Sequence, residues 1–129
     1  MKICICDDDK TIHKIIKSYF NNYTFSSSFL ISDLYSAEEL INSYSQKKYY
    51  DVILLDIEML QISGIDAAEE IKKITPNVIV IFISNHPKYV FDTFKVEPLH
   101  FLVKPLSEQD FFDVFKRALH KYKTLNENP

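Results

Sequence analysis

The segment VILLDIEM, residues 52–59, contains four consecutive apolar residues followed by an acid, Asp56. A run of this length, rich in Val, Ile and Leu, is typical of a strand that is buried on both faces of a sheet. The segment KICICDDD, residues 2–9, repeats the pattern, and its apolar run is followed by Asp7 and Asp8. Two buried strands that both end at acids are therefore predicted.

Later apolar runs end at side chains of a different kind. Residues 78–83 are followed by Ser84, and residues 99–103 are followed by Lys104. Residues 29–34 provide a fifth candidate strand. If the strands are parallel, their carboxyl ends meet at one edge of one sheet, where ligands bind in folds of this kind. Acids, a hydroxyl and an amine are then expected to lie together at that edge.

Segments with helical spacing separate the strands. In residues 12–20, apolar side chains recur three and four positions apart, which places them on one stripe of a helix. A similar stripe, expected to be buried, consists of Ala67, Ala68, Ile71 and Ile74. The residues expected to cap or begin the helices are Asp9, Ser36, Ser63, Pro87 and Ser107. Alternating strands and helices predict a doubly wound, three-layer α/β domain with a parallel sheet.

Length and composition restrict the class of protein. The chain has 129 residues, 47% of them hydrophobic and 26% charged, as expected for one globular domain. A net charge of -3 gives this domain no basic footprint for nucleic acid. No apolar stretch approaches the roughly 20 residues that span a bilayer, and no signal peptide precedes the first strand, so a cytoplasmic protein without a membrane partner is expected. Cys4 and Cys6 share one face of a strand and are expected to be unpaired core residues.

The predicted cluster of acids favours a metal site. Carboxylates from Asp7, Asp8 and Asp56 repel one another unless a cation lies between them, and oxygen ligands without His or Cys select Mg²⁺, with Mn²⁺ as the alternative ion. An aspartate can also attack phosphorus to form an acyl phosphate. Lys104 and Ser84 would then bind the phosphoryl group, because this transfer depends largely on positioning and electrostatics.

Four motifs, in this order and on these elements, resemble those of the receiver domains of two-component response regulators. They are ICICDDD, ILLDIEM, IFIS and FLVKP, and the resemblance extends over essentially the whole chain. It implies a flavodoxin-like (βα)5 fold with strand order 2-1-3-4-5. It also implies a regulatory domain that is not an enzyme, with a sensor histidine kinase as the phosphoryl donor.

The resemblance implies a role for each acid of the site. Asp56 matches the phosphoacceptor, and Asp7 and Asp8 match the metal-binding acidic pair. Glu58 matches the residue whose backbone carbonyl binds the metal together with these carboxylates.

The remaining motif residues match the groups that bind the phosphoryl oxygens and respond to them. Lys104 matches the phosphate-contacting lysine, and its bond to Pro105 is implied to be cis. Ser84 and Phe101 match the hydroxyl and the aromatic residue that move together on phosphorylation.

The chain departs from the family pattern near the phosphoacceptor. Leu60 stands where proline is usual, and Asn85 is larger than the residue commonly found there, which is expected to narrow access to the phosphoryl group. The side chain of Glu58 is placed to influence the attack of water on the acyl phosphate. Gly64 is the only glycine, and a positive φ is predicted for it.

Residues 79–105 are similar to receivers attached to DNA-binding domains of the LytTR type. This resemblance divides the chain into a receiver domain, residues 1–123, and a tail or linker, residues 124–129, leading to an effector domain absent from this chain. It implies transcription control, DNA binding only through that effector domain, and dimerisation on phosphorylation through the fourth helix, fifth strand and fifth helix. Aromatic residues expected near that face are Tyr89, Phe91, Phe94, Phe111 and Phe112.

Each residue also has a purely structural interpretation when it is taken alone. Residues 7–9 would form a solvated turn with a helix cap, Ser84 would be a loop serine and Lys104 a solvent-facing charge. Phe101 would be a core residue. His86, two residues after Ser84, is a weaker candidate for the edge of the site.

Two other functions remain open. A small phosphatase of the haloacid dehalogenase type also uses a strand-end aspartate, Mg²⁺, a hydroxyl and a lysine, but its chemistry needs a second aspartate where this chain has Glu58. A receiver-like module that binds its partner without phosphate is the other alternative.

Overall fold

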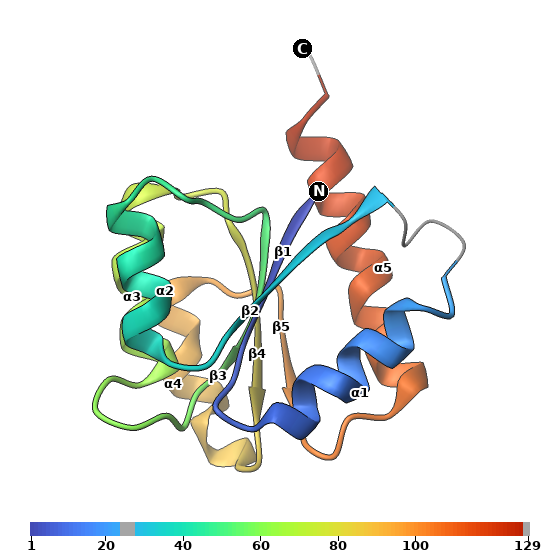
Figure 1. The fold of residues 1–129 in the computed structure, drawn as a ribbon, viewed down its shortest axis with the longest axis horizontal. Coiled ribbons are helices and arrows are strands. Elements are labelled where there is room, and N and C mark those ends of the chain that lie inside the picture. The colour runs from blue at the N-terminus through green and yellow to red at the C-terminus, as the bar shows by residue number, and fades with distance from the viewer. Residues whose placement is uncertain (24–27, 128–129) are drawn as a thin grey trace.

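The computed structural model describes residues 1–23 and 28–127 (Figure 1). The strands within these ranges are β1 (Lys2–Cys6), β2 (Leu30–Leu34), β3 (Val52–Asp56), β4 (Ile79–Ser84) and β5 (His100–Val103). Neighbouring strands are parallel and follow the order β2-β1-β3-β4-β5. The predicted fold class and strand order are confirmed.

The helices alternate with the strands. They are α1 (Lys10–Phe20), α2 (Ala37–Ser45), α3 (Gly64–Ile74), α4 (Val90–Thr93) and α5 (Glu108–Leu125), with 3₁₀ turns η2 (Pro87–Tyr89) and η3 (Phe94–Val96) on either side of α4. The side chains that accept a hydrogen bond from the first turn of a helix are those of Asp9, Ser36, Ser63 and Ser107. Each satisfies a backbone N–H that has no partner within its helix, so the predicted caps are confirmed.

Helices cover both faces of the sheet, as Figure 1 shows. On one face, α1 and α5 pack against strand residues such as Ile5 and Leu54. On the other face, α2, α3 and Val96 pack against residues such as Cys6 and Leu55. Successive residues of a strand point to opposite faces, so each central strand contributes to both cores. The three-layer arrangement leaves the carboxyl edge of the sheet for the polar residues.

Aromatic rings form much of the core between α1 and α5. The Phe20 ring contacts the Phe111 and Phe115 rings edge to face, with centroids 5.2 and 4.8 Å apart. Phe111 is 1% exposed and belongs to this core rather than to an exposed partner-binding face. Phe91 and Phe94, in contrast, are exposed.

Two helix ends differ from expectation. Ile74 was expected on the buried stripe of α3, but its side chain is 49% exposed, because it lies in the last turn, beyond the last buried position at Ile71. Helix α5 continues to Leu125, past the boundary at residue 123, since the Asn126 N–H still bonds to carbonyls of the last turn. Residues 128–129 of the predicted tail lie outside the described residues.

The cysteines behave as core residues. Cys4 and Cys6 are buried and not disulfide-bonded, and burial raises the pKa of both thiols. Across residues 1–23 and 28–127, every helix is too short or too polar to span a bilayer.

Candidate functional site

The three predicted acids come together at the carboxyl edge of the sheet. Asp7 and Asp8 follow β1, and Asp56 ends β3, the strand next to β1. One carboxylate oxygen from each lies within 4.8 Å of the others. Asp7 and Asp56 are buried, whereas Asp8 is exposed. The cluster is therefore anchored in the core and reached from solvent on the Asp8 side.

Lys104 reaches this cluster from β5. Its Nζ lies 2.9 Å from Asp7 Oδ2 and 3.5 Å from Asp56 Oδ1, and its side chain is only 9% exposed. The Lys104 N–H donates to the Ser84 carbonyl at 2.8 Å, and the Lys104–Pro105 bond is cis, as the family resemblance implied. The solvent-facing interpretation of Lys104 is wrong, because the ammonium is held between two buried carboxylates.

The charged side chains at this edge include more acids than bases. Burial, followed by the charge of Asp7, raises the pKa of Asp56 to about 7, even though Lys104 acts in the opposite direction. Burial lowers the pKa of Lys104, but the hydrogen bonds and charges of Asp7 and Asp56 outweigh it and raise that pKa. Three carboxyl groups thus share one ammonium, which leaves room for a further positive charge.

The donor set fits a small, hard dication. Asp7 Oδ1 accepts the Asp9 N–H at 2.8 Å. Asp7 Oδ2 is buried, and the Lys104 ammonium lies 2.9 Å from it. Mg²⁺ prefers oxygen ligands such as carboxylates over histidine nitrogen or cysteine sulfur. The residues present are thus compatible with the predicted metal.

Ser84 lies at the end of β4 and is fully buried. Its hydroxyl donates to Glu58 Oε1 at 3.4 Å and accepts the His86 N–H at 3.0 Å. His86 Nε2 in turn lies 3.3 Å from Glu58 Oε1. The Ser84 hydroxyl therefore has partners in the unphosphorylated chain, and His86 lies beside them.

Gly64 is needed for close approach rather than for a positive φ. No described glycine has a positive φ, so that prediction is wrong. A Cβ at Gly64 would lie 2.0 Å from the Asp56 carbonyl oxygen. The Gly64 N–H donates to the Ile57 carbonyl at 2.9 Å. The first turn of α3 thus packs directly against the backbone of Asp56.

The remaining residues predicted near the site are more exposed to solvent. Phe101 is half-buried and packs against the core beneath α2 and α3. Leu60 is 83% exposed, and the loop without proline has Gln61 at a φ of 68°. Asn85 is exposed.

Sequence reasoning assigned no role to His13, yet it contacts the site. Its Nε2 lies 2.7 Å from the carbonyl oxygen of Asp7. Helical spacing places His13 beside the apolar residues Ile12 and Ile16, and a polar residue at the border of a buried stripe was the available signal. The spacing of residues along the sequence did not show that His13 contacts Asp7.

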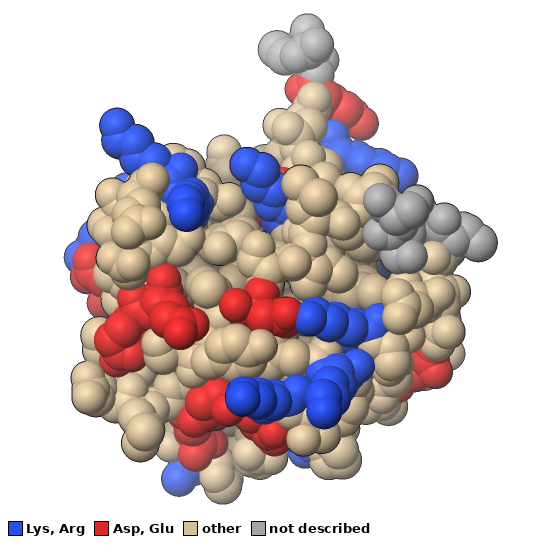
Figure 2. All heavy atoms as spheres, viewed as in Figure 1, with Lys and Arg blue, Asp and Glu red and all other residues tan. Residues whose placement is uncertain are grey.

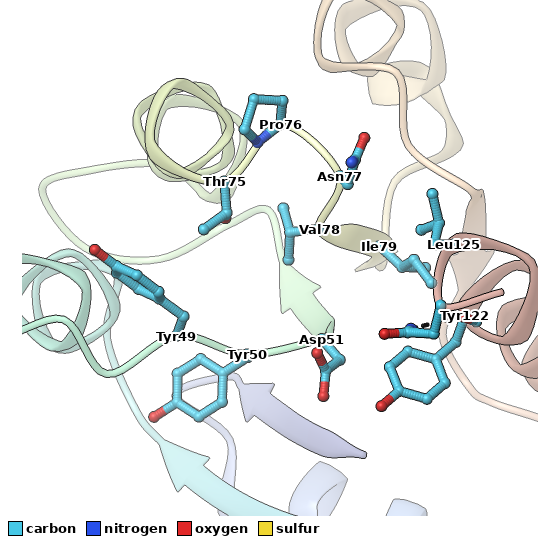
Figure 3. A pocket seen from close by; sticks show the side chains of 11 residues that line it. Tyr49, Tyr50, Asp51, Thr75, Pro76, Asn77, Val78, Ile79, Tyr122 and Leu125 are labelled. Carbon is cyan, nitrogen blue, oxygen red and sulfur yellow. Dashed lines mark hydrogen bonds between the residues drawn. The ribbon is translucent and has the colours of Figure 1, made fainter. Parts of the chain in front are cut away.

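A hollow at the opposite end of the sheet is separate from this site. It is lined by side chains including Tyr49, Asp51 and Asn77, and by Tyr122 and Leu125 of α5 (Figure 3). None of its lining residues belongs to the predicted site. It is therefore not part of the chemistry at the carboxyl edge.

A parallel (βα)5 sheet with clustered acids, a buried lysine and a serine at its carboxyl edge defines a receiver domain. The family described as the response regulator receiver domain matches residues 3–116. The chain therefore belongs to the receiver domain family.

The chain is similar in sequence to bacterial sensory transduction proteins. The chain is 25% identical over 127 residues to the sensory transduction protein LytR of Staphylococcus haemolyticus, covering 98% of this chain and 48% of LytR. It is 26% identical over 98 residues to the sensory transduction protein LytT of Bacillus subtilis, covering 74% of this chain and 39% of LytT. The chain thus spans less than half the length of these relatives, which support the LytTR-type resemblance.

A solved structure shows the same fold. The response regulator TrrA of Thermotoga maritima, in complex with Mg²⁺ and BeF, superposes with a TM-score of 0.77 at 24% identity, covering 91% of this chain and 97% of that chain.

Proposed function

We propose that this chain is the phosphoacceptor half of a LytTR-type transcription regulator, which receives a phosphoryl group on Asp56 from a sensor histidine kinase. The observation that carries the proposal is the position of Lys104 between Asp7 and Asp56, at 2.9 and 3.5 Å. A buried cation beside a strand-end aspartate is arranged to balance the charge of a phosphoryl group on that aspartate.

The transfer forms one bond and breaks one. An Asp56 carboxylate oxygen forms a bond to phosphorus while the P–N bond of the donor phosphohistidine breaks. The electron pair of the P–N bond stays on the imidazole nitrogen, which takes up a proton from solvent. Lys104 and the Ser84 hydroxyl then bind phosphoryl oxygens of the acyl phosphate. The chain accepts the group as a signalling domain and is not an enzyme.

The residues that would hold Mg²⁺, or Mn²⁺, are Asp7, Asp8, Asp56 and the backbone carbonyl of Glu58. The bound ion would supply positive charge to the phosphoryl oxygens and keep Asp56 ionised. The binding of Mg²⁺ and BeF by the structurally similar TrrA supports this assignment.

The conformational response begins at Ser84. To reach a phosphoryl oxygen, its hydroxyl must leave Glu58 Oε1, and Phe101 then turns further into the space beneath α4. These movements would change the α4-β5-α5 face and favour a homodimer. DNA binding would come from an effector domain joined to this one by a linker after α5, and the whole regulator would act in the cytoplasm.

The experiment that tests the phosphoacceptor is intact mass spectrometry after incubation with acetyl phosphate and Mg²⁺. The parent should gain the mass of one phosphoryl group, and Asp56→Asn should gain none. No gain in the parent would instead support the phosphate-independent binding module. Sustained hydrolysis of p-nitrophenyl phosphate would support the haloacid dehalogenase-type phosphatase.

A further inference from the structure

His13 connects three elements near the acidic cluster. It projects from α1 and is 3% exposed. Its Nε2 lies 2.7 Å from the Asp7 carbonyl oxygen, and its Nδ1 lies 2.7 Å from Asp33 Oδ1 on β2. Lys17, one turn further along α1, contacts the other oxygen of Asp33. A buried imidazole thus bridges the end of β1 and the end of β2.

Both contacts of the ring are made to acceptors. A carbonyl oxygen can only accept, so Nε2 carries the hydrogen that it donates to Asp7. Burial raises the pKa of Asp33, but the hydrogen bonds from Lys17 and His13 outweigh it and lower that pKa, so Asp33 is an ionised acceptor for Nδ1. A hydrogen bond to an ionised acceptor such as Asp33 belongs to the stronger class of hydrogen bonds.

The carbonyl that His13 contacts belongs to the peptide unit joining Asp7 and Asp8. That peptide sets the direction in which both side chains leave the backbone. The Asp7 N–H donates to the Leu34 carbonyl at 3.1 Å, so the same residue is held from β2 on its other side. The two acids are therefore oriented by contacts that lie outside the cluster itself.

We infer that His13 is a positioning residue that sets the affinity of this acidic cluster for its divalent cation, acting through the peptide between Asp7 and Asp8. The inference rests on the proposed function, because it assumes that the cluster binds Mg²⁺. Groups that orient metal ligands from outside the ligand set commonly change metal affinity by about 10-fold to 100-fold when they are removed.

The test compares His13→Phe with the parent by isothermal titration with MgCl₂ in the absence of phosphoryl donors. Phenylalanine keeps a ring beside Tyr35, whose centroid lies 4.5 Å from that of His13, but it donates to neither acceptor. The Mg²⁺ dissociation constant should rise about tenfold, at the lower end of the range for such residues, because the ligands themselves remain. Phosphorylation by acetyl phosphate should then need more Mg²⁺ and recover when Mg²⁺ is raised.

A control separates positioning from general loss of stability. Ile16→Val, in the buried core on the same helix, should lower stability and leave the Mg²⁺ dissociation constant unchanged. An unchanged constant in His13→Phe, or an equal rise in both variants, would overturn the inference. If His13→Phe does not fold, Asp33→Asn decides: a weaker affinity supports the bridge, and an unaltered one overturns it. Failure of the parent to bind Mg²⁺ would instead overturn the proposed function.

Discussion

Asp56 lies in surroundings that oppose its ionisation. Burial and Asp7 raise its pKa to about 7, and Lys104 offsets this only in part. A protonated carboxyl is a poor nucleophile, so a second positive charge is needed to bring Asp56 fully into its reactive form. We therefore expect phosphorylation of Asp56 to depend on a bound cation.

The raised pKa of Asp56 predicts a pH-dependent stability. The unfolded carboxyl has the ordinary pKa of 3.8, whereas the folded one has a pKa of about 7. Between these values the folded state binds more protons than the unfolded state, so the free energy of unfolding falls as pH rises. In urea titrations with EDTA, the free energy of unfolding of Asp56→Asn should exceed that of the parent by a margin that grows with pH. This margin should increase by about 1–3 kcal/mol from about pH 5 to pH 8. Parallel pH profiles for the two proteins would contradict this.

Glu58 is predicted to restrain the Ser84 hydroxyl and to repel the incoming phosphoryl group. Glu58→Ala removes an acceptor 3.4 Å from Ser84 Oγ together with one negative charge. Phosphorylation by acetyl phosphate should become roughly threefold faster, which corresponds to less than about 1 kcal/mol in the barrier. The time course of intact mass measures this rate. Glu70→Ala, at an exposed glutamate of α3, is the control and should react at the parent rate.

The connection from β3 to α3 positions Asp56, the proposed phosphoacceptor. Gly64 begins α3 and packs against the Asp56 carbonyl, so the helix and the reactive residue share one contact. Ser63 accepts the Asp66 N–H at 3.1 Å and starts the helix at this point. The position of Asp56 therefore depends on the helix start as well as on the strand.

Gly64→Ala should disturb both stability and reactivity. Its Cβ would lie 2.0 Å from a backbone oxygen, so α3 or Asp56 must shift, at a cost of about 1–3 kcal/mol. Urea titration should show this loss, and phosphorylation of the folded protein should slow. Ser63→Ala loses a helix cap worth about 1 kcal/mol but should keep the parent phosphorylation rate. Normal phosphorylation in Gly64→Ala would show that the close contact does not position Asp56.

The surface of the domain near α4 carries exposed aromatic rings. Phe91 is 80% exposed and Phe94 58%, and their ring centroids lie 5.6 Å apart. Charges of both signs are interspersed on the face shown in Figure 2, without a continuous basic surface. That face gives no sign of direct nucleic-acid binding, while the aromatic pair fits a protein partner such as a second copy.

Phe91→Ser should weaken dimerisation without loss of stability. Beryllofluoride, which mimics a phosphoryl group on aspartate, should shift the parent toward a dimer in sedimentation velocity experiments. Phe91→Ser should raise the dimer dissociation constant about tenfold, since an aromatic ring buried at an interface commonly contributes more than about 1 kcal/mol. Ile74→Ser, at a 49% exposed position on α3, should dimerise as the parent does. Dimerisation of Phe91→Ser at parent strength would remove this face from the interface.

The order of the elements and the residues that meet at the carboxyl edge of the sheet could be predicted from the amino-acid sequence. Caps such as Ser36 and Ser107 were predictable because a cap is a contact between residues three apart. The approach of Lys104 to Asp56 was predictable because each follows or ends an apolar run, and parallel strands bring such ends together. The stripe on α3 was less informative at Ile74, because periodicity does not show where the covered surface ends.

The contacts between residues distant in the sequence became visible in the folded chain. The pKa of Asp56 depends on burial and on Asp7, which lies on a different strand. Gly64 proved necessary because another segment's backbone occupies the place of a Cβ, not because of its own dihedral angle. His13 contacts Asp7 and Asp33 only after α1 packs beside both strand ends. The spacing of residues along the sequence determines which of them can form a helix or strand. The environment of each side chain depends on how these elements pack together, and spacing gives no information about that packing.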